Sequence, residues 1–132
     1  MKHIVLYDMD GTLTPPRETM EESLIPVLEK LSEVAEIGIV TGSNYDYLKQ
    51  QIGLLLDHSI IRKKLHLLPC NGTKHYYPPS NNYEEHKLLS EVNMIDQLGR
   101  HKFQQLMLLL IQQQANFSNE RFPLTGHFID YR

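Results

Sequence analysis

The chain has 132 residues, of which 22% are charged and 41% are hydrophobic, and its formal net charge is −3. This length suits one domain, or one domain with part of a second, and allows a substantial buried core. The slightly acidic balance offers no basic surface for nucleic acid or an anionic membrane, and no apolar run approaches the roughly twenty residues that cross a bilayer. We therefore expect neither nucleic acid nor membrane as a partner, and a cytoplasmic location.

The first apolar run, residues 4–7, stops at Asp8 and Asp10 and continues into Gly11 and two prolines. Because its apolar residues do not alternate with polar ones, we interpret it as a strand buried on both faces of a parallel sheet. In α/β proteins the chemistry gathers where such strands end. The sequence therefore predicts a pair of carboxylates at the mouth of a crevice.

The next stretch predicts a βαβ unit followed by a second helix. Ser23 precedes apolar residues at helical spacing up to residue 34, and as the N-cap it would place Pro26 in the first turn. A second apolar run, 37–40, ends at Thr41-Gly42-Ser43 and reads as the parallel strand. Asn44 is expected to cap the following helix, whose buried stripe comprises Leu48, Ile52, Leu55 and Leu56.

The rest of the chain predicts a hairpin, a linker and a long helix. A third apolar run, 65–68, ends at a Pro-Cys-Asn-Gly turn, and 75–77 are expected to return as its partner strand. Residues 78–83 have linker composition, and 85–92 form a weaker strand candidate. The helix expected at 99–115 would turn five apolar side chains inward: Phe103, Leu106, Met107, Leu110 and Ile111.

Three further interpretations concern single features of the sequence. The last residues, 127–132, alternate as a strand would. The basic trio at 62–64 is interpreted as a solvated loop rather than an anion site. Cys70 has no second cysteine to pair with and is expected to be a buried thiol.

The two aspartates could serve one reacting centre. Carboxylates two residues apart in a tight turn repel unless a cation sits between them, and Mg²⁺ is a suitable partner because it takes oxygen ligands and keeps several waters. An exposed aspartate can attack phosphorus while a neighbouring carboxyl carries the proton. Free N–H groups of Gly11 and Thr12 would receive phosphate oxygens. For Asp-x-Asp-Gly alone, a turn or a calcium loop is the alternative. An EF-hand is excluded because this sequence lacks the acidic ligand that the EF-hand loop needs at its twelfth position.

The longer string DMDGTLT, residues 8–14, resembles the first motif of the haloacid dehalogenase superfamily. Its continuation, Pro-Pro-Arg at 15–17, resembles the eukaryotic-type phosphomannomutase family within that superfamily. Three later segments are similar to this family in order along the chain: 37–53 to its second core segment, 69–72 to its Pro-Glu-Asn-Gly segment, and 126–132 to a strand of its cap domain. The resemblance implies an α/β fold with a Rossmann-like core and parallel sheet at 1–80, followed by the beginning of an α+β cap domain at 81–132.

The resemblance also implies a role for each matching residue. Asp8 would be the phosphate-accepting nucleophile and Asp10 the general acid/base, with Mg²⁺ bound by the Asp8 carboxylate and the Asp10 carbonyl. Ser43 falls on a phosphate-facing position, while Arg17 and Arg132 match arginines that contact the sugar phosphate. A guanidinium suits that role because its planar fork pairs with two phosphate oxygens. The alternatives are a solvated loop residue for Arg17 and a frayed terminus for Arg132.

The match departs from the family in two residues and in extent. Thr41 stands where the family usually has glycine, and Cys70 where it usually has glutamate. The similarity corresponds to the family's N-terminal half, whereas its core lysine and acidic metal loop belong to the other half. Three functions follow as hypotheses: a phosphomannomutase-like phosphotransferase acting on hexose phosphates, a sugar-phosphate phosphatase, and an inactive remnant or binding module. A homodimer through the cap is an open alternative for assembly.

Overall fold

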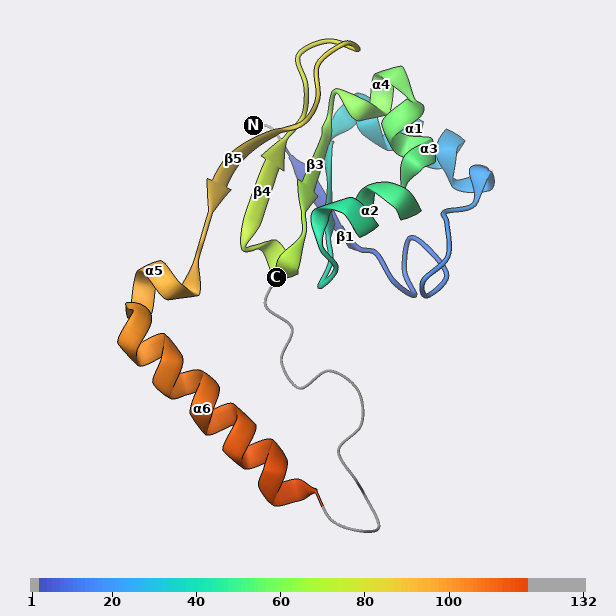
Figure 1. The fold of residues 1–132 in the computed structure, drawn as a ribbon. Helices are drawn as coiled ribbons and strands as arrows, with labels where there is room; N and C mark the ends of the chain where they lie inside the picture. The colour runs from blue at the N-terminus through green and yellow to red at the C-terminus, as the bar shows by residue number, and fades with distance from the viewer. Residues whose placement is uncertain (1–2, 119–132) are drawn as a thin grey trace. The chain divides into compact units, whose positions relative to one another are not determined.

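The computed structural model describes residues 3–118. Its centre is a mixed five-stranded sheet in which the strands lie side by side in chain order (Figure 1). The strands are β1 (Ile4–Asp8), β2 (Glu36–Val40), β3 (Leu65–Leu68), β4 (Lys74–Tyr77) and β5 (Lys87–Glu91). The first three are parallel, and β4 and β5 each run antiparallel to the strand before them. The predicted α/β class is confirmed, and the parallel sheet that was predicted corresponds to β1–β3.

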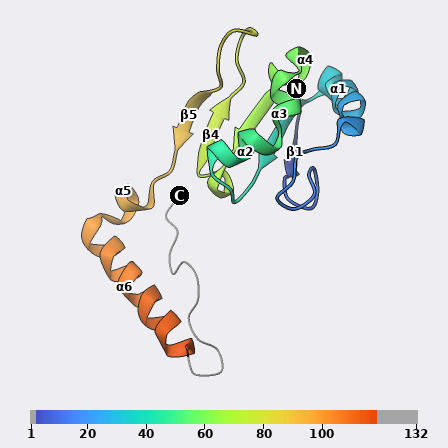
Figure 2. The same ribbon diagram turned by 45° about the vertical axis from the view of Figure 1, so that its right-hand side comes forward.

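Four helices cover one face of this sheet (Figures 1 and 2). They are α1 (Ile25–Val34), α2 (Tyr45–Gln51), α3 (Gly53–Asp57) and α4 (Ser59–Arg62). We call this the covered face, and define it by the fully buried side chains of Ile37, Ile39, Leu65 and Leu67. The core is built against helical residues that include Leu28, Leu48, Ile52, Leu55 and Ile61. Alternation along each strand turns the intervening side chains to the opposite side.

We call that opposite side the open face, because no helix of the compact unit ending at Glu91 covers it. Its residues from the first four strands include Ile4, Leu6, Glu36, Gly38, His66, Leu68 and His75. A Cβ atom at position 38 would overlap Leu6 Cδ2 and would lie 3.4 Å from methyl carbons of Ile4 and Leu68. On the open face, therefore, side chains of neighbouring strands fold over the space that Gly38 leaves.

The prediction that the first strand is buried on both faces is wrong. In the described sheet β1 is an edge strand, and Ile4 and Leu6 are 47% and 55% exposed. The strands with continuous burial are β2 and β3, which have neighbours on both sides. An apolar run without alternation therefore identified a strand, but it did not identify which strand is central.

The predicted helices exist, with corrected ends. Ser23 is not the N-cap of α1: it lies in a 3₁₀ turn, Glu22–Leu24, and its hydroxyl donates to Glu21 Oε2 at 3.2 Å. Pro26 does occupy the first turn of α1. Asn44 caps α2 as predicted, accepting the Tyr47 N–H at 2.9 Å. The single helix expected after it is divided at Ile52, just before a glycine that weakens helix continuation.

The predicted hairpin of β3 and β4 is also confirmed. Two residues of the basic trio at 62–64 form hydrogen bonds with backbone carbonyls of other segments. Arg62 donates to the backbone carbonyls of Leu56 and Glu84, at 3.4 and 2.7 Å, and its side chain is only 18% exposed. The Lys64 ammonium donates to the Ser32 carbonyl. The interpretation of 62–64 as a solvated loop is therefore wrong for these two residues. Cys70 is a buried free thiol, as predicted.

A second compact unit begins at Val92. Its described helices are α5 (Met94–Leu98) and α6 (Arg100–Phe117), joined by Gly99 at φ 76°, a conformation that glycine adopts readily. The helix predicted at 99–115 is confirmed, but its predicted inward stripe is not: no residue of α6 is buried, and Leu110 and Ile111 are 42% and 48% exposed. The strand expected at 127–132 lies outside the described residues. The core and cap domains at 1–80 and 81–132 stay a prediction.

Among residues 3–118, no helix combines the length and apolar character that crossing a bilayer requires.

Candidate active site

The loop after β1 closes on one carbonyl oxygen. The Met9 carbonyl accepts the N–H groups of Thr12, Leu13 and Thr14, at 3.3, 3.0 and 2.9 Å, and the Thr14 hydroxyl at 3.2 Å. The Gly11 N–H donates to the Thr14 carbonyl at 2.7 Å, and Gly11 takes a positive φ of 79°. Met9 is fully buried. The chain therefore shapes the loop with its own hydrogen bonds and anchors it to the core.

This closure corrects one expectation about phosphate binding. The N–H groups of Gly11 and Thr12 are not free, because both donate within the loop. The Thr12 bond is the longest of the set, at 3.3 Å, and goes to an oxygen that three other donors share. Any contact of Gly11 or Thr12 with phosphate would have to replace or bifurcate these bonds, or use the Thr12 hydroxyl. Their phosphate-binding role stays a prediction.

Asp10 is held from two sides. Its Oδ1 accepts the Arg17 backbone N–H at 3.0 Å and the Gln51 side-chain amide at 3.4 Å. The hydrogen bonds among the described residues use only Oδ1, so Oδ2 is available to an external group. Arg17 itself sits at φ 62°, a strained conformation for a residue with a Cβ. The backbone thus turns back at Arg17 and brings that residue beside the second carboxylate.

Gln51 is the contact that the sequence prediction missed. It lies on α2 three residues after Leu48 and four before Leu55, so it falls on the buried stripe, and it is only 3% exposed. Its carbonyl accepts the Met20 N–H at 3.0 Å, while its side-chain Oε1 is buried without a hydrogen-bond partner among the described residues. A polar residue on an apolar stripe was the signal that could have found it.

Asp8 ends β1 with an exposed side chain, opposite Val40 in the parallel register with β2. The turn that holds Ser43 begins one residue beyond Val40, so Asp8 and Ser43 lie at the same edge of the sheet, where the parallel strands end. No ion pair among residues 3–118 engages Asp8. The fold therefore brings the Asp8 carboxylate and the turn that carries Ser43 to the same edge of the sheet.

The second and third loops at this edge are tied to each other. The Cys70 N–H donates to the Ser43 carbonyl at 2.9 Å, and the Asn71 N–H to the Thr41 carbonyl at 2.8 Å. Thr41, which is buried, accepts the Ser43 N–H on its hydroxyl at 3.1 Å. The Ser43 N–H is therefore occupied within the turn, and the Ser43 hydroxyl is the group left for phosphate. Arg132, the last predicted site residue, lies outside the described residues.

The donors at this edge fit Mg²⁺ in part. The ion typically takes one or two carboxylates and keeps several waters, and it also accepts carbonyl oxygens. The exposed Asp8 carboxylate matches this preference, and no backbone hydrogen bond among the described residues uses the Asp10 carbonyl. Within residues 3–118 no group of three metal-ligating side chains gathers at one point. Within residues 3–118, the Asp8 carboxylate and the Asp10 carbonyl are therefore the oxygens that would hold Mg²⁺.

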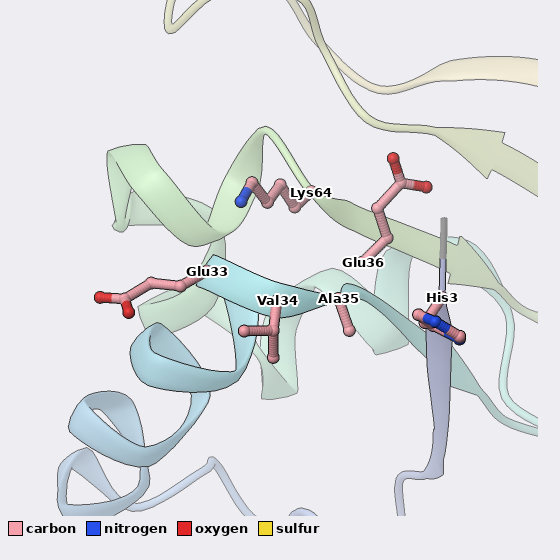
Figure 3. A pocket seen from close by; sticks show the side chains of 6 residues that line it. All are labelled: His3, Glu33, Val34, Ala35, Glu36 and Lys64. Atoms are coloured by element: carbon pink, nitrogen blue, oxygen red, sulfur yellow. The ribbon is translucent and has the colours of Figure 1, made fainter. Parts of the chain in front are cut away.

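Two hollows of the described surface lie away from these carboxylates. One, of about 210 Å³, is at the start of β1 and β2, the opposite end of the sheet from Asp8 (Figure 3). Figure 3 shows the carboxylate of Glu36 and the ammonium of Lys64 pointing in different directions, so the polar groups of this hollow do not converge. The other, of about 430 Å³, lies between the first turn of α1 and residues 54–58. Neither includes a predicted site residue.

Sequence comparison relates the whole chain to one enzyme family. The chain is 31% identical over 130 residues to phosphomannomutase 1 from Homo sapiens, and 32% identical over 133 residues to a phosphomannomutase from Schizosaccharomyces pombe. These alignments cover 98% and 99% of this chain, but 45% and 47% of the relatives. The chain is a relative of the phosphomannomutases. It spans about half the length of the curated phosphomannomutases that it matches, and no protein-family model matches it.

Solved structures support the fold. A haloacid dehalogenase-like hydrolase from Bacillus subtilis aligns with a TM-score of 0.62 at 16% identity, covering 86% of this chain and 34% of the hydrolase. A C-terminally truncated Plasmodium falciparum IMP-nucleotidase aligns with a TM-score of 0.63 at 15% identity, covering 87% of this chain and 34% of the truncated nucleotidase. The predicted resemblance to phosphomannomutases and to the haloacid dehalogenase fold is thus confirmed.

Proposed function

We propose that the chain carries the phosphoryl-accepting loop of a phosphomannomutase-like phosphotransferase, which interconverts hexose 6-phosphate and hexose 1-phosphate, with mannose phosphates as substrates. The observation that carries this proposal is the match to phosphomannomutases along 98% of the chain. The geometry supports it, because Asp8, the Asp10 carboxylate and the Ser43 hydroxyl occupy one edge of the sheet. A cytoplasmic location belongs to the same proposal.

The chemistry assigns one role to each carboxylate. An Asp8 oxygen attacks phosphorus, the bond from phosphorus to the sugar oxygen breaks, and protonated Asp10 donates its proton to that leaving oxygen. In the second half the Asp10 carboxylate takes the proton from the other sugar hydroxyl, which attacks the aspartyl phosphate and releases Asp8. Asp10 Oδ2 suits the proton transfer, since Oδ1 is already engaged by Arg17 and Gln51. Bound Mg²⁺ would supply charge neutralisation at the phosphate.

The test is an assay of the purified chain with Mg²⁺, mannose 1-phosphate and a hexose bisphosphate activator. Asp8→Asn is expected to reduce turnover on the order of a thousandfold or more, because the nucleophile is lost. Asp10→Asn is expected to reduce it by about a hundredfold or more, through loss of proton transfer. Glu18→Gln, an exposed acid in the same loop, is the matched control and should keep wild-type turnover. No turnover, or turnover that Asp8→Asn leaves intact, would overturn the proposal.

A sugar-phosphate phosphatase is the second candidate, and one contact favours it. The Thr41 hydroxyl occupies the Ser43 N–H, at a position where the mutase-like pattern has glycine. In a phosphatase, water would replace the sugar hydroxyl in the second half of the reaction. Release of inorganic phosphate without any isomerised sugar would distinguish the phosphatase from the mutase.

A binding module without turnover is the remaining candidate, together with a homodimer through the cap. It is motivated by the span of about half of the relatives and by the absence of an ion pair on Asp8 within residues 3–118. Calorimetric titration with Mg²⁺ and inorganic phosphate, combined with light scattering, tests it. Phosphate binding that Asp8→Asn weakens, in a chain without turnover, would support this candidate over both enzymes.

A further inference from the structure

A continuous chain of three polar side chains crosses the open face, away from the carboxylate loop. Glu36 of β2, His66 of β3 and His75 of β4 lie side by side: His66 Nε2 is 2.9 Å from Glu36 Oε2, and His66 Nδ1 is 2.8 Å from His75 Nε2. The His66 side chain is 5% exposed and that of Glu36 24%. The edge of the His66 ring meets the face of Tyr77, with ring centroids 5.0 Å apart and planes at 88°. We call Glu36, His66 and His75 the relay.

The hydrogen-bond chemistry of the relay limits how many protons it can hold. Ionised Glu36 only accepts, so His66 Nε2 carries a hydrogen, and in neutral His66 the other nitrogen then accepts from His75 Nε2–H. One added proton is tolerated, either on the outer nitrogen of His75 or on His66 with the tautomer of His75 reversed. Two added protons are not tolerated, because an N–H would then face an N–H across 2.8 Å. The relay is therefore intact with at most one imidazolium.

The relay crosses the boundary between β3 and β4, the seam of the sheet that has the fewest backbone pairs. β2 and β3 pair from Ile37–Leu65 to Val40–Leu68, whereas the register between β3 and β4 is formed at Leu67–Tyr76 alone. β4 and β5 pair at four positions, with a register irregularity between His75 and Tyr76, and so form one hairpin. Side chains must supply much of the attachment of that hairpin to the parallel strands. Among the described residues, His66–His75 is the side-chain hydrogen bond that crosses this seam on the open face, beside the His66–Tyr77 ring contact.

We propose that the relay is an acid-released latch, which holds the β4–β5 hairpin against the parallel strands until both histidines are charged. Release separates His75 from His66 and loosens β4 on the open face. The covered-face attachments persist, because the Tyr45–Tyr76 ring stack, with centroids 3.9 Å apart, does not change with imidazole charge. His86 also keeps its bond to the Leu65 carbonyl at 2.8 Å, since a protonated imidazole still donates.

The surroundings are consistent with release only in acid. Burial, and then the neighbouring His66, lower the pKa of His75 from its ordinary value. Two imidazolium rings held 2.8 Å apart would repel each other, which favours their separation once both are charged. The titratable and charged groups that neighbour the relay are His3 before β1, Lys64 before β3, Tyr77 and Lys74 from β4, and His86, Lys87 and Glu91 on the hairpin's second arm.

The test follows amide hydrogen exchange of the intact chain at about pH 7.5 and about pH 5, corrected for intrinsic exchange rates. Protection of Lys74–Tyr77 is expected to fall by about tenfold or more relative to Glu36–Val40 on acidification. His75→Gln should abolish this loss, because the amide can donate to or accept from His66 without titrating. His101→Gln, an exposed histidine of α6, is the matched control and should keep the loss.

Equal loss of protection in β2 and β4, no loss in either, or an unchanged loss in His75→Gln would overturn the latch. If His75→Gln does not fold, an imidazole NMR titration of the wild-type chain decides. The latch predicts that uptake of the second proton coincides with loss of the Tyr77 ring-current shift on His66. Two charged imidazoles with that shift retained would overturn it.

Discussion

The two faces of the sheet remove their side chains from water in different ways. On the covered face, Ile37, Ile39, Leu65 and Leu67 are removed from water by helices α1–α4. On the open face the same strands bury His66 by surrounding it with other polar and aromatic side chains. The first solution depends on apolar area and shape, and the second on paired hydrogen bonds whose strength varies with protonation. Successive residues of one strand can therefore contribute a contact that does not depend on protonation and a contact that does.

The largest expected effect compares neighbouring leucines of β3 that point to opposite faces. Leu67→Ala should lower the free energy of unfolding by about 3 kcal/mol, because it leaves a cavity in a fully buried core. Leu68→Ala, on the open face and only partly buried, should lower it by about 1 kcal/mol. Urea denaturation of both variants checks the comparison. Equal losses would show that the open face is as well packed as the covered one.

The next largest effect concerns the hydrogen bond between Arg62 of α4 and Glu84, which lies in the loop between β4 and β5. Arg62→Ala should lower the free energy of unfolding by about 2 kcal/mol, because the Glu84 carbonyl, 2.7 Å from Nη2, loses a charged donor. Arg62→Lys keeps the charge but not the planar fork, so it should recover only part of the loss. Thermal or urea unfolding measures both. A lysine variant as stable as the wild type would indicate that charge alone suffices.

A smaller effect is the dependence of stability on pH. Burial lowers the pKa of His86, and burial together with His66 lowers that of His75. Because both folded-state pKa values lie below the unfolded one, stability is full above about pH 6.5 and declines as the pH falls through the folded values. Denaturation at several pH values should show this decline. His75→Gln and His86→Gln should each flatten it, and identical curves in all three proteins would contradict the assignment.

The smallest effect tests how the open face covers Gly38. Gly38→Ala places a methyl group against Leu6 Cδ2, the movable end of a half-exposed side chain, so the free energy of unfolding should fall by about 0.5–1 kcal/mol. In a Leu6→Ala background the same change should be neutral. The double-mutant cycle isolates this coupling. A cost that persists without Leu6 would place the constraint in the backbone instead.

The sequence predicted the strands, the hairpin and the Asn44 cap because each has a local cause. Apolar runs ending at turn residues, and a side chain able to accept an N–H three residues later, need no knowledge of the rest of the fold. The position of β1 at an edge, by contrast, depends on which strands pair with it. Residue types within β1 carry no information about that pairing, so Ile4 and Leu6 were wrongly expected to be buried.

The candidate site was predictable in its residues and less so in its hydrogen bonds. A carboxylate pair after a strand located the loop, but the closure of that loop on the Met9 carbonyl uses backbone groups, which no residue pattern reveals. Gln51 and the relay were missed because their contacts cross between elements. His66 stands among three leucines in its strand, and its partners became identifiable only when the register placed Glu36 and His75 beside it.

The Met9 carbonyl has a consequence for binding thermodynamics. Because four donors already fix the loop to a buried residue, its conformational entropy is lost when the chain folds and not when a ligand arrives. A cation or phosphate that enters at Asp8 therefore meets a rigid partner and orders little of the protein. Its binding should show a heat-capacity change near zero, in contrast to the large negative value of a loop that folds around its ligand.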